Sequence, residues 1–435
     1  MEENESLRRE INALKRQLAL PPQPEPEQMS KFAGIKQAQY VSTPHFYYPQ
    51  VESAPPVMPC FRLIDDLGRV VDEEAAAHVP PIPREFALAV MATMIRVSEF
   101  DKIFLDAQRQ GRISFYLTSR GEEGCSVGSA AALSSQDWIL PQYRELGAIF
   151  WRGWSFDEVA NQLCATANDP AHGRQLPLHI GSYDRHMLYV KSTLGTQCPH
   201  AAGVGYGMKM RKRDQISIAY FGEGCASEGD IPSALNIAAV HGCPTIYFCR
   251  NNGYAISTST RDQYASDGIA PRGPAFGLPT IRVDGNDPLA VMVATRKARE
   301  IGLKEGLPTL IEAMTYRIGA HSTSDDDSKY RNPIAPEEGW GSERAYWEAR
   351  SPIIRFGRYL QSLGWFNVQM EEQLRTAARK EAIQSLNSAS QAPSPKVGTL
   401  YTDVLDDKPW TLREQEAEMY DMMERYPEHY KAFRK

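Results

Sequence analysis

The sequence lacks the marks of several large classes of protein. Its seven cysteines are scattered and form no CxxC pair, which argues against a zinc site or a disulfide framework and favours a reducing compartment. No apolar run approaches the roughly 18 residues that a membrane-spanning helix needs. No long basic run occurs either, and the formal net charge is -6. We therefore expect a protein that binds no nucleic acid and does not enter a membrane.

What the sequence contains is the composition of an ordinary globular protein. Of its 435 residues, 42% are hydrophobic and 23% are charged, and this length suits two or three domains or one large core with extensions. The N-terminal segment is rich in acids, unlike a mitochondrial presequence. Apolar residues recur there at helical spacing from Leu7 to Leu18, so residues 1–28 are interpreted as a short amphipathic helix followed by a proline-rich linker.

Hydrophobic periodicity divides the rest of the chain into three parts. Residues 29–84 hold many prolines and aromatics with little periodicity and are interpreted as an extended arm. Residues 85–350 form the predicted core, where helical patterns alternate with apolar runs that predict strands at 216–221, 244–250, 280–285 and 308–317. This alternation predicts an α/β fold, with a parallel sheet flanked by helices and ligands bound beyond the carboxyl ends of its strands. Residues 351–435 are predicted to be a helical region for subunit contacts.

The stretch "YFGEGCASEGD" places Glu223 between two glycines directly after a predicted strand. A carboxylate repels phosphate, so it suits a phosphate site only where a cation lies between them. Asn251 and Asn252 follow Gly224 after an interval of 26 residues. Mg²⁺ prefers octahedral oxygen ligation, which the Glu223 carboxylate, the Asn252 carbonyl and the Tyr254 backbone could supply beside a diphosphate. The glycines allow close approach of the diphosphate, and the next helix would add its N-terminal dipole.

A diphosphate also needs positive charge, and other interpretations of these motifs compete. Arg144 and Arg250 are the candidate phosphate-binding arginines, because a guanidinium grips phosphate with two donors. The GEG motif alone is more often a capping acid in a glycine-rich turn. "GVGYG", from Gly203 to Gly207, resembles a dinucleotide motif, but it lies inside an apparent helix. Close helix packing therefore explains it better than NAD binding.

Five stretches together indicate a family. The GEG and NN motifs resemble the GDG and NN signature of thiamine-diphosphate enzymes, with Glu in place of Asp. "YFGEGCASEGD", "CRNNGYAIST", "IRVDGND", "LIEAMTYRIGAHSTSDDDSKYR" and "RQGRISFYLTSRGEEGCSVGSAAAL" resemble the alpha subunits of branched-chain 2-oxo acid dehydrogenase decarboxylases. The resemblance runs from about residue 60 to the C-terminus. It implies the thiamine-diphosphate-binding fold, thiamine diphosphate and Mg²⁺ as cofactors, and oxidative decarboxylation of branched-chain 2-oxo acids in the catabolism of valine, leucine and isoleucine. The acyl group would then pass to the lipoyl arm of an acyltransferase core.

The resemblance also assigns roles to individual residues. Those that match cofactor contacts of the family are Gln142, Tyr143, Arg144, Ser192, Leu194, Gly222, Glu223, Gly224, Cys225, Arg250, Asn252 and His321. Those that match its magnesium ligands are Glu223, Asn252 and Tyr254. An apolar pocket for the branched side chain would be lined by Phe115, Tyr143 and Leu194. Such a pocket discriminates by only about 1–3 kcal/mol per methylene, so straight-chain substrates should overlap.

The loop after the last predicted strand carries the expected catalytic and regulatory residues. His321 matches the active-site histidine of the family, and its polar loop suits proton transfer, although a lone histidine is more often structural. Ser322 matches an inhibitory phosphorylation site, which implies a kinase and a phosphatase as partners; the alternative is a simple loop serine. The residues that match those ordering the loop are Arg317, Asp325, Tyr330 and Arg331.

Three positions depart from the family pattern. Ala320 stands where relatives often carry a second histidine, and Asn332 stands where a second phosphorylated serine is expected, so dual-site control is not expected. Lys191 replaces a serine in a stretch that corresponds to a structural potassium loop. The potassium loop would comprise Lys191, Thr193, Thr196 and Gln197. Because a lysine ammonium could replace the ion, both occupants stay open.

The expected partner is a beta subunit. In this family the beta subunit supplies the glutamate that activates the aminopyrimidine ring, and this chain is too short to carry both halves, so we expect an α₂β₂ heterotetramer that is inactive without beta. The alternatives are a pyruvate-specific alpha subunit and a non-catalytic regulatory subunit of the same fold. "GAHSTSDD" and "RVDGND" favour the branched-chain type, and intact Glu223, Arg250, Asn252 and His321 count against a non-catalytic one. The resemblance implies the mitochondrial matrix in a eukaryote or the cytoplasm in a bacterium.

Overall fold

The computed structural model describes residues 29–30, 32, 38–46, 57–331, 342–402 and 405–431. The predicted amphipathic helix and linker of residues 1–28 lie outside these ranges, as does Asn332. Within the described ranges, no helix combines the length and the apolar character that crossing a bilayer requires.

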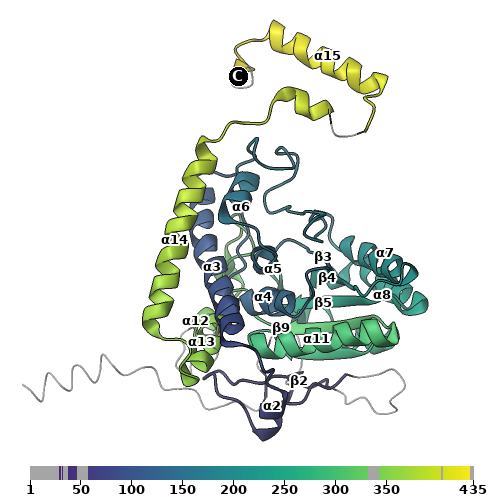
Figure 1. Ribbon diagram of the computed structural model, residues 1–435, viewed down its shortest axis with the longest axis vertical. Coiled ribbons are helices and arrows are strands. Elements are labelled where there is room, and N and C mark those ends of the chain that lie inside the picture. The colour runs from purple at the N-terminus through teal and green to yellow at the C-terminus, as the bar shows by residue number, and fades with distance from the viewer. Residues whose placement is uncertain are drawn as a thin grey trace, which may run out of the picture.

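A parallel sheet forms the centre of the described chain (Figure 1). Its seven strands have the order β1-β2-β8-β9-β5-β4-β3, and all neighbours run parallel. The strands are β1 (Tyr40–Val41), β2 (Cys60–Phe61), β3 (Trp138–Leu140), β4 (Ser217–Gly222), β5 (Thr245–Asn251), β8 (Thr280–Asp284) and β9 (Thr309–Met314). A small antiparallel ribbon pairs β6 (Tyr254–Ala255) with β7 (Thr258–Ser259). The predicted α/β fold is confirmed, and the four strands predicted from apolar runs are β4, β5, β8 and β9.

The central strands are buried on both faces because alternate side chains enter two separate cores. In β4, Ile218 and Tyr220 pack into the larger core, while Ala219 and Phe221 pack into the smaller one. Successive residues of a strand point to opposite faces, so a strand covered on both sides needs apolar residues at every position. This is why these strands stand out in the sequence as continuous apolar runs.

Helices cover both faces of this sheet (Figure 1). Those packed into the larger core are α3 (Arg84–Arg109), α4 (Glu123–Ala131), α5 (Leu146–Trp151), α6 (Phe156–Leu163) and α11 (Pro288–Glu305). The opposite face carries α7 (Gln197–Met210) and α8 (Asp230–His241). The short helices α9 (Thr260–Gln263) and α10 (Arg272–Ala275) precede β8. "GVGYG" lies within α7, where a Cβ on Gly205 would come 2.4 Å from Oγ1 of Thr245, so close packing does explain this glycine.

The segment interpreted as an extended arm also contributes regular structure. Its strands β1 and β2 form one edge of the sheet, where β2 pairs with β8. A short helix follows, α2 (Glu73–His78), which Asp72 caps by accepting a hydrogen bond from the Ala75 amide at 2.7 Å. The sheet therefore begins before residue 85, where the sequence analysis placed the start of the core.

The C-terminal region is helical, as predicted. It comprises α13 (Pro352–Ser362), α14 (Val368–Gln391) and α15 (Trp410–Arg425), preceded by α12 (Glu343–Glu348). Helix α14 packs along α3, and in Figure 1 α15 lies beyond the end of α14, away from the sheet. Trp410 and Tyr426 leave large apolar surface exposed on this last helical piece.

Candidate active site

The candidate site lies beyond the carboxyl ends of the central strands. Gly222 at the end of β4 pairs with Arg250 near the end of β5, so the segments that follow these strands leave the sheet side by side. The next strand outward, β3, is followed closely by Gln142, and β9 leads to the loop that carries His321. Parallel strands place all their carboxyl ends at one edge, which brings together residues far apart in the sequence.

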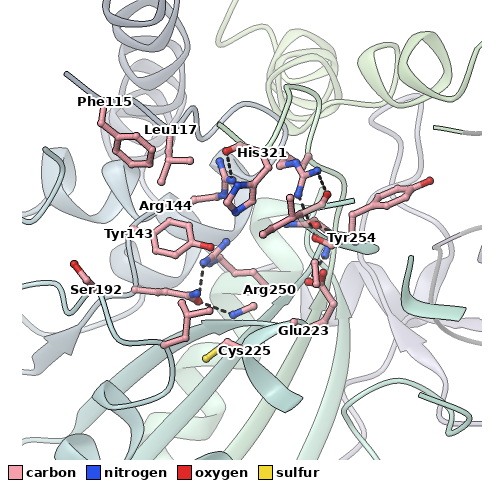
Figure 2. A pocket seen from close by; sticks show the side chains of 18 of the residues that line it. Phe115, Leu117, Tyr143, Arg144, Ser192, Glu223, Cys225, Arg250, Tyr254 and His321 are labelled. Atoms are coloured by element: carbon pink, nitrogen blue, oxygen red, sulfur yellow. Dashed lines mark hydrogen bonds between the residues drawn. The ribbon is translucent and has the colours of Figure 1, made fainter. Parts of the chain in front are cut away.

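A cavity of about 430 Å³ opens at this edge (Figure 2). All of the residues predicted to contact the cofactor, the magnesium ion or the substrate side chain line it. The lining residues that the sequence analysis did not assign to this cavity are Leu117, Leu176, His179, Ala255, Ile256 and Arg317.

Glu223 lies at the base of the cavity with its carboxylate only 1% exposed. One oxygen, Oε2, accepts a hydrogen bond from the backbone amide of Asn252 at 3.2 Å, whereas Oε1 has no hydrogen-bond partner among the described residues. Burial raises the pKa of Glu223 to about 7. A buried carboxylate oxygen without a partner is costly unless a proton or a cation lies against it. This oxygen is therefore suited to a metal ion.

The two neutral oxygens expected beside Glu223 are also present. The Asn252 side chain donates from Nδ2 to Glu122 at 2.9 Å, which fixes the orientation of the amide, and its Oδ1 accepts from the Tyr254 amide at 3.2 Å. The Tyr254 carbonyl accepts from Arg317 at 3.2 Å. Each oxygen keeps a second lone pair for a cation. No cluster of three or more His, Cys, Asp or Glu side chains suited to a metal occurs in the described chain.

Two acids that the sequence analysis did not single out hold Arg250 in place. Glu122 forms an ion pair with its Nη1, and Glu145 lies 2.6 Å from its Nε; all three side chains are buried. Glu145 also accepts from the backbone amide of Gln142 at 2.9 Å. Burial raises the pKa of Glu122, but the positive charge of Arg250 outweighs this and leaves the pKa below its usual value. Glu122 stands in the quoted stretch "SRGEEGCSVG", but a pair of acids there gave no sign that one of them faces an arginine.

Two other arginines form no ion pair with a carboxylate among the described residues. Arg144 donates to the carbonyl oxygens of Thr118 and His321, both at 2.6 Å. Arg317 donates to the carbonyl of Ile256 at 2.7 Å and to the hydroxyl of Tyr330 at 2.9 Å. Because both guanidiniums bond to neutral oxygens, their positive charges are available to an anion bound in the cavity.

His321 lies beside these arginines, above the cavity (Figure 2). Burial, together with the positive charges of Arg144 and Arg317, lowers its pKa to about 3. The ring of Tyr143 approaches it edge-on, with 6.3 Å between the ring centroids. The imidazole is therefore neutral at ordinary pH and can accept a proton or a hydrogen bond.

Part of the cavity lining is apolar. It includes the predicted pocket residues Phe115 and Leu194, together with Leu117, Leu176 and Ile256. Ile256 has a φ of 57°, a left-handed conformation that is strained for a β-branched residue. Such strain persists only where the surroundings enforce it, and here the carbonyl of Ile256 is held by the arginine described above.

The loop that carries His321 is cross-linked by the residues expected to order it. Asp325 accepts from the amide of His321 at 2.7 Å and from the Tyr330 hydroxyl. Arg331 donates to the Arg317 carbonyl at 2.6 Å. Ser322 does not line the main cavity; it lies in a neighbouring polar cavity that also includes Arg109, Arg120 and Arg344. The predicted phosphorylation site is thus next to His321 in the chain but faces different surroundings.

The stretch predicted to bind potassium lies outside the cavity, apart from Ser192 and Leu194. Lys191 and Thr193 are exposed, and the Thr196 hydroxyl donates to the Thr193 carbonyl at 2.9 Å. Gln197 donates to the Tyr220 carbonyl at 2.9 Å, while its buried Oε1 has no hydrogen-bond partner among the described residues. These contacts do not show whether a potassium ion or the Lys191 ammonium occupies the loop. Potassium binding therefore stays a prediction.

The backbone of the site suits a bulky anionic group. The Gly222 amide donates to Gln142 at 2.7 Å, and a Cβ on Gly224 would lie 2.5 Å from the Cβ of Ala255. The close approach of the chain to Ala255 at Gly224 therefore depends on the lack of a side chain at that position. With a carboxylate oxygen that lacks a partner on one side and two arginines on another, the residues fit a diphosphate bound through a divalent cation.

Comparisons with known proteins agree with this chemistry. Residues 90–398 match the model of the dehydrogenase E1 component family. The chain is 41% identical to subunit alpha 2 of mitochondrial 2-oxoisovalerate dehydrogenase from Arabidopsis thaliana, over 93% of this chain and 86% of that protein. The corresponding alpha subunit of Caenorhabditis elegans is 44% identical over 86% and 85% of the two chains, and that of Homo sapiens is 41% identical over 92% and 87%. The family predicted from the motifs is confirmed: this chain belongs to the dehydrogenase E1 components, among the 2-oxoisovalerate dehydrogenase alpha subunits.

Proposed function

We propose that this chain, with a beta subunit, forms the thiamine-diphosphate-dependent decarboxylase of a branched-chain 2-oxo acid dehydrogenase complex. The observation that carries the proposal is one cavity lined both by Arg144 and Arg317 and by Glu223, whose Oε1 has no hydrogen-bond partner among the described residues. Family membership supplies the class of reaction, and the cavity supplies a place for a metal-bound diphosphate.

The cofactor would be held by residues from three strand ends. Glu223, the Asn252 side chain and the Tyr254 carbonyl are the proposed Mg²⁺ ligands. Arg144 is the proposed main source of positive charge for the diphosphate, because Arg250 is already paired with two carboxylates. When bound, thiamine diphosphate supplies the carbanion chemistry that allows a 2-oxo acid to lose CO₂. The chain supplies binding, orientation and the exclusion of water.

The apolar residues of the cavity lining would select the substrate. Phe115 and Leu194, together with Leu117, offer the branched side chain a surface that a polar acid would not occupy. A methylene in such a pocket contributes about 1–3 kcal/mol, so a straight-chain acid is disfavoured rather than excluded.

His321 would handle protons and the acyl group at the cavity mouth. Its neutral imidazole can accept a proton as charge moves during acyl transfer to the lipoyl arm. Arg144 holds the backbone of His321 through its carbonyl, so the same arginine orients the histidine and lowers its pKa.

The proposed partners follow from the family and from surfaces of the chain. The beta subunit would complete an α₂β₂ assembly, and the lipoyl-bearing acyltransferase would receive the acyl group. Residues 351–435, with the exposed Trp410 and Tyr426, are the proposed region of subunit contact. A kinase and a phosphatase would act on Ser322, where added charge would oppose the acids of the same loop. The relatives carry mitochondrial names, and the mitochondrial matrix is the proposed compartment.

The first experiment measures CO₂ release that depends on thiamine diphosphate and Mg²⁺. The chain is assayed alone and with a cognate beta subunit, on 3-methyl-2-oxobutanoate and on pyruvate. We expect release only with beta and faster on the branched acid. Preference for pyruvate would change the proposed substrate but not the proposed reaction. A stable complex that releases no CO₂ from either acid would contradict the proposal.

A further inference from the structure

A second histidine borders the cavity and is not explained by the proposed chemistry. His179 is buried, and its Nε2 lies 2.6 Å from the hydroxyl of Ser192, while its Nδ1 lies 3.0 Å from the carbonyl oxygen of Pro177. Both His179 and Ser192 line the cavity. The imidazole is therefore held between a fixed acceptor on one side and a hydroxyl that faces the proposed cofactor on the other.

The backbone next to His179 is strained, which shows that its position is enforced. Leu178 has a φ of 67°, in the left-handed region that a residue with a branched side chain rarely adopts. The side-chain amide of Gln162, on α6, holds this turn from both sides: its Oε1 accepts from the Leu178 amide at 2.9 Å, and its Nε2 donates to the Leu176 carbonyl at 2.8 Å. Gln162 is itself buried. Strain that is over-determined in this way clusters at functional sites.

The contacts settle the tautomer of a neutral His179. A carbonyl oxygen can only accept, so Nδ1 of His179 must carry a proton, and a neutral imidazole then has its lone pair on Nε2. In that tautomer the hydroxyl of Ser192 donates to Nε2, which leaves only lone pairs of its oxygen for the cavity. Without His179, the same hydroxyl could rotate and present either its hydrogen or its lone pairs.

We propose that His179 is a positioning residue that fixes the Ser192 hydroxyl as a hydrogen-bond acceptor toward the cavity. The inference rests on the proposed function, because only a bound thiamine diphosphate would supply the donor that matches this acceptor. A 2-oxo acid offers only acceptors, whereas the amino group of an aminopyrimidine offers N–H donors. The fixed polarity of Ser192 would therefore favour the amino-bearing cofactor over an analogue with an oxygen at that place.

The test measures binding in the assembled complex with beta and Mg²⁺ present. Thiamine diphosphate and oxythiamine diphosphate, in which a keto oxygen replaces the amino group, are titrated by quenching of protein fluorescence. The variants are His179→Ala, Ser192→Ala and the double variant, with His200→Ala as the control, since His200 is exposed on α7. Melting temperatures and the assembled mass report whether each variant keeps its structure.

We expect each single variant to weaken binding of thiamine diphosphate about tenfold, the range of one hydrogen bond, and to reduce the preference over the keto analogue. The double variant should be no weaker than the singles, because His179 acts through Ser192. Losses that add to about a hundredfold, or an unchanged preference in Ser192→Ala, would overturn the inference. If His179→Ala does not assemble, His179→Gln takes its place in every comparison, because Ser192→Ala alone does not report on His179. If the parent complex binds no thiamine diphosphate, the proposed function fails; if it binds and the variants match it, only the role of His179 fails.

Discussion

At the scale of single residues, the ability of a buried arginine to attract an anion depends on what already neutralises it. Arg250 is paired with both Glu122 and Glu145, so its single positive charge is fully offset before any ligand arrives. Arg144 and Arg317 bond to neutral oxygens instead. The same uncompensated charge that suits a diphosphate holds His321 neutral, so binding of an anion should raise the pKa of that histidine.

Replacement of His321 tests its role in acyl transfer. Because a positioned acid or base contributes about 10²–10⁴-fold, His321→Ala should slow acylation of a lipoyl domain by that range. The measurement is the rate of lipoyl acylation by the assembled complex, with His200→Ala as a matched exposed histidine. Overall turnover equal to that of the parent would remove His321 from the mechanism.

The lowered pKa of His321 also predicts a dependence of stability on pH. The folded imidazole stays neutral down to about pH 3, whereas the unfolded one binds a proton below its ordinary value of 6.5. Between these values acid favours the unfolded state, so the parent loses stability as the pH falls through this window, and above it the effect is absent. The melting temperature of His321→Gln minus that of the parent should therefore rise by on the order of 2 °C when the pH falls from 7.5 to 5.5. A difference between variant and parent that does not change with pH would contradict the lowered pKa.

At the scale of elements, the turn after β4 depends on a position without a side chain. A Cβ at Gly224 would meet the Cβ of Ala255 at 2.5 Å, whereas one at Gly229, only a few residues later, would meet nothing within 4 Å. Gly224→Ala must push β6 or the turn away from the cavity floor, so we expect binding of thiamine diphosphate to weaken at least tenfold. Gly229→Ala should leave binding within about twofold. Equal dissociation constants for the two variants, measured by fluorescence titration, would contradict the close approach.

The elements found from the sequence and those missed differ in a physical way. Long strands buried on both faces, such as β4 and β5, carry uninterrupted apolar runs, and the motifs at their ends follow at once. The short strands β1, β2 and β3 have two or three residues each, too few to establish a period, and their place depends on pairing with distant strands. Glu122, Glu145 and His179 were missed for a similar reason: each acts through a partner far along the chain, and a lone acid or histidine gives no sign of that partner.

At the scale of the whole molecule, one buried cluster of charges joins the N-terminal segment, the sheet and the C-terminal helices. Arg355 of α13 forms ion pairs with Asp66, which follows β2, and with Asp284 at the end of β8. Arg350 adds a second contact to Asp66 at 3.0 Å. The paired acids raise the pKa of Arg355, although its burial opposes this. The cluster therefore ties the segment before residue 85 to the helical region, across the edge of the sheet.

Removing one member of such a cluster leaves buried charges without a partner. Arg355→Ala should lower the free energy of unfolding by about 3–5 kcal/mol, measured by urea denaturation of the chain. Most of that loss comes from the stranded carboxylate of Asp284 rather than from lost attraction, because Asp66 keeps its ion pair with Arg350. Adding Asp284→Asn should therefore recover a large part of it. Arg379→Ala, at an exposed position of α14, should change stability by no more than about 0.5 kcal/mol. If Arg355→Ala lowered the free energy of unfolding as little as that control, the cluster would contribute little to stability. The packing of α13 and α14 on α3 would then have to hold the C-terminal helices against the rest of the fold.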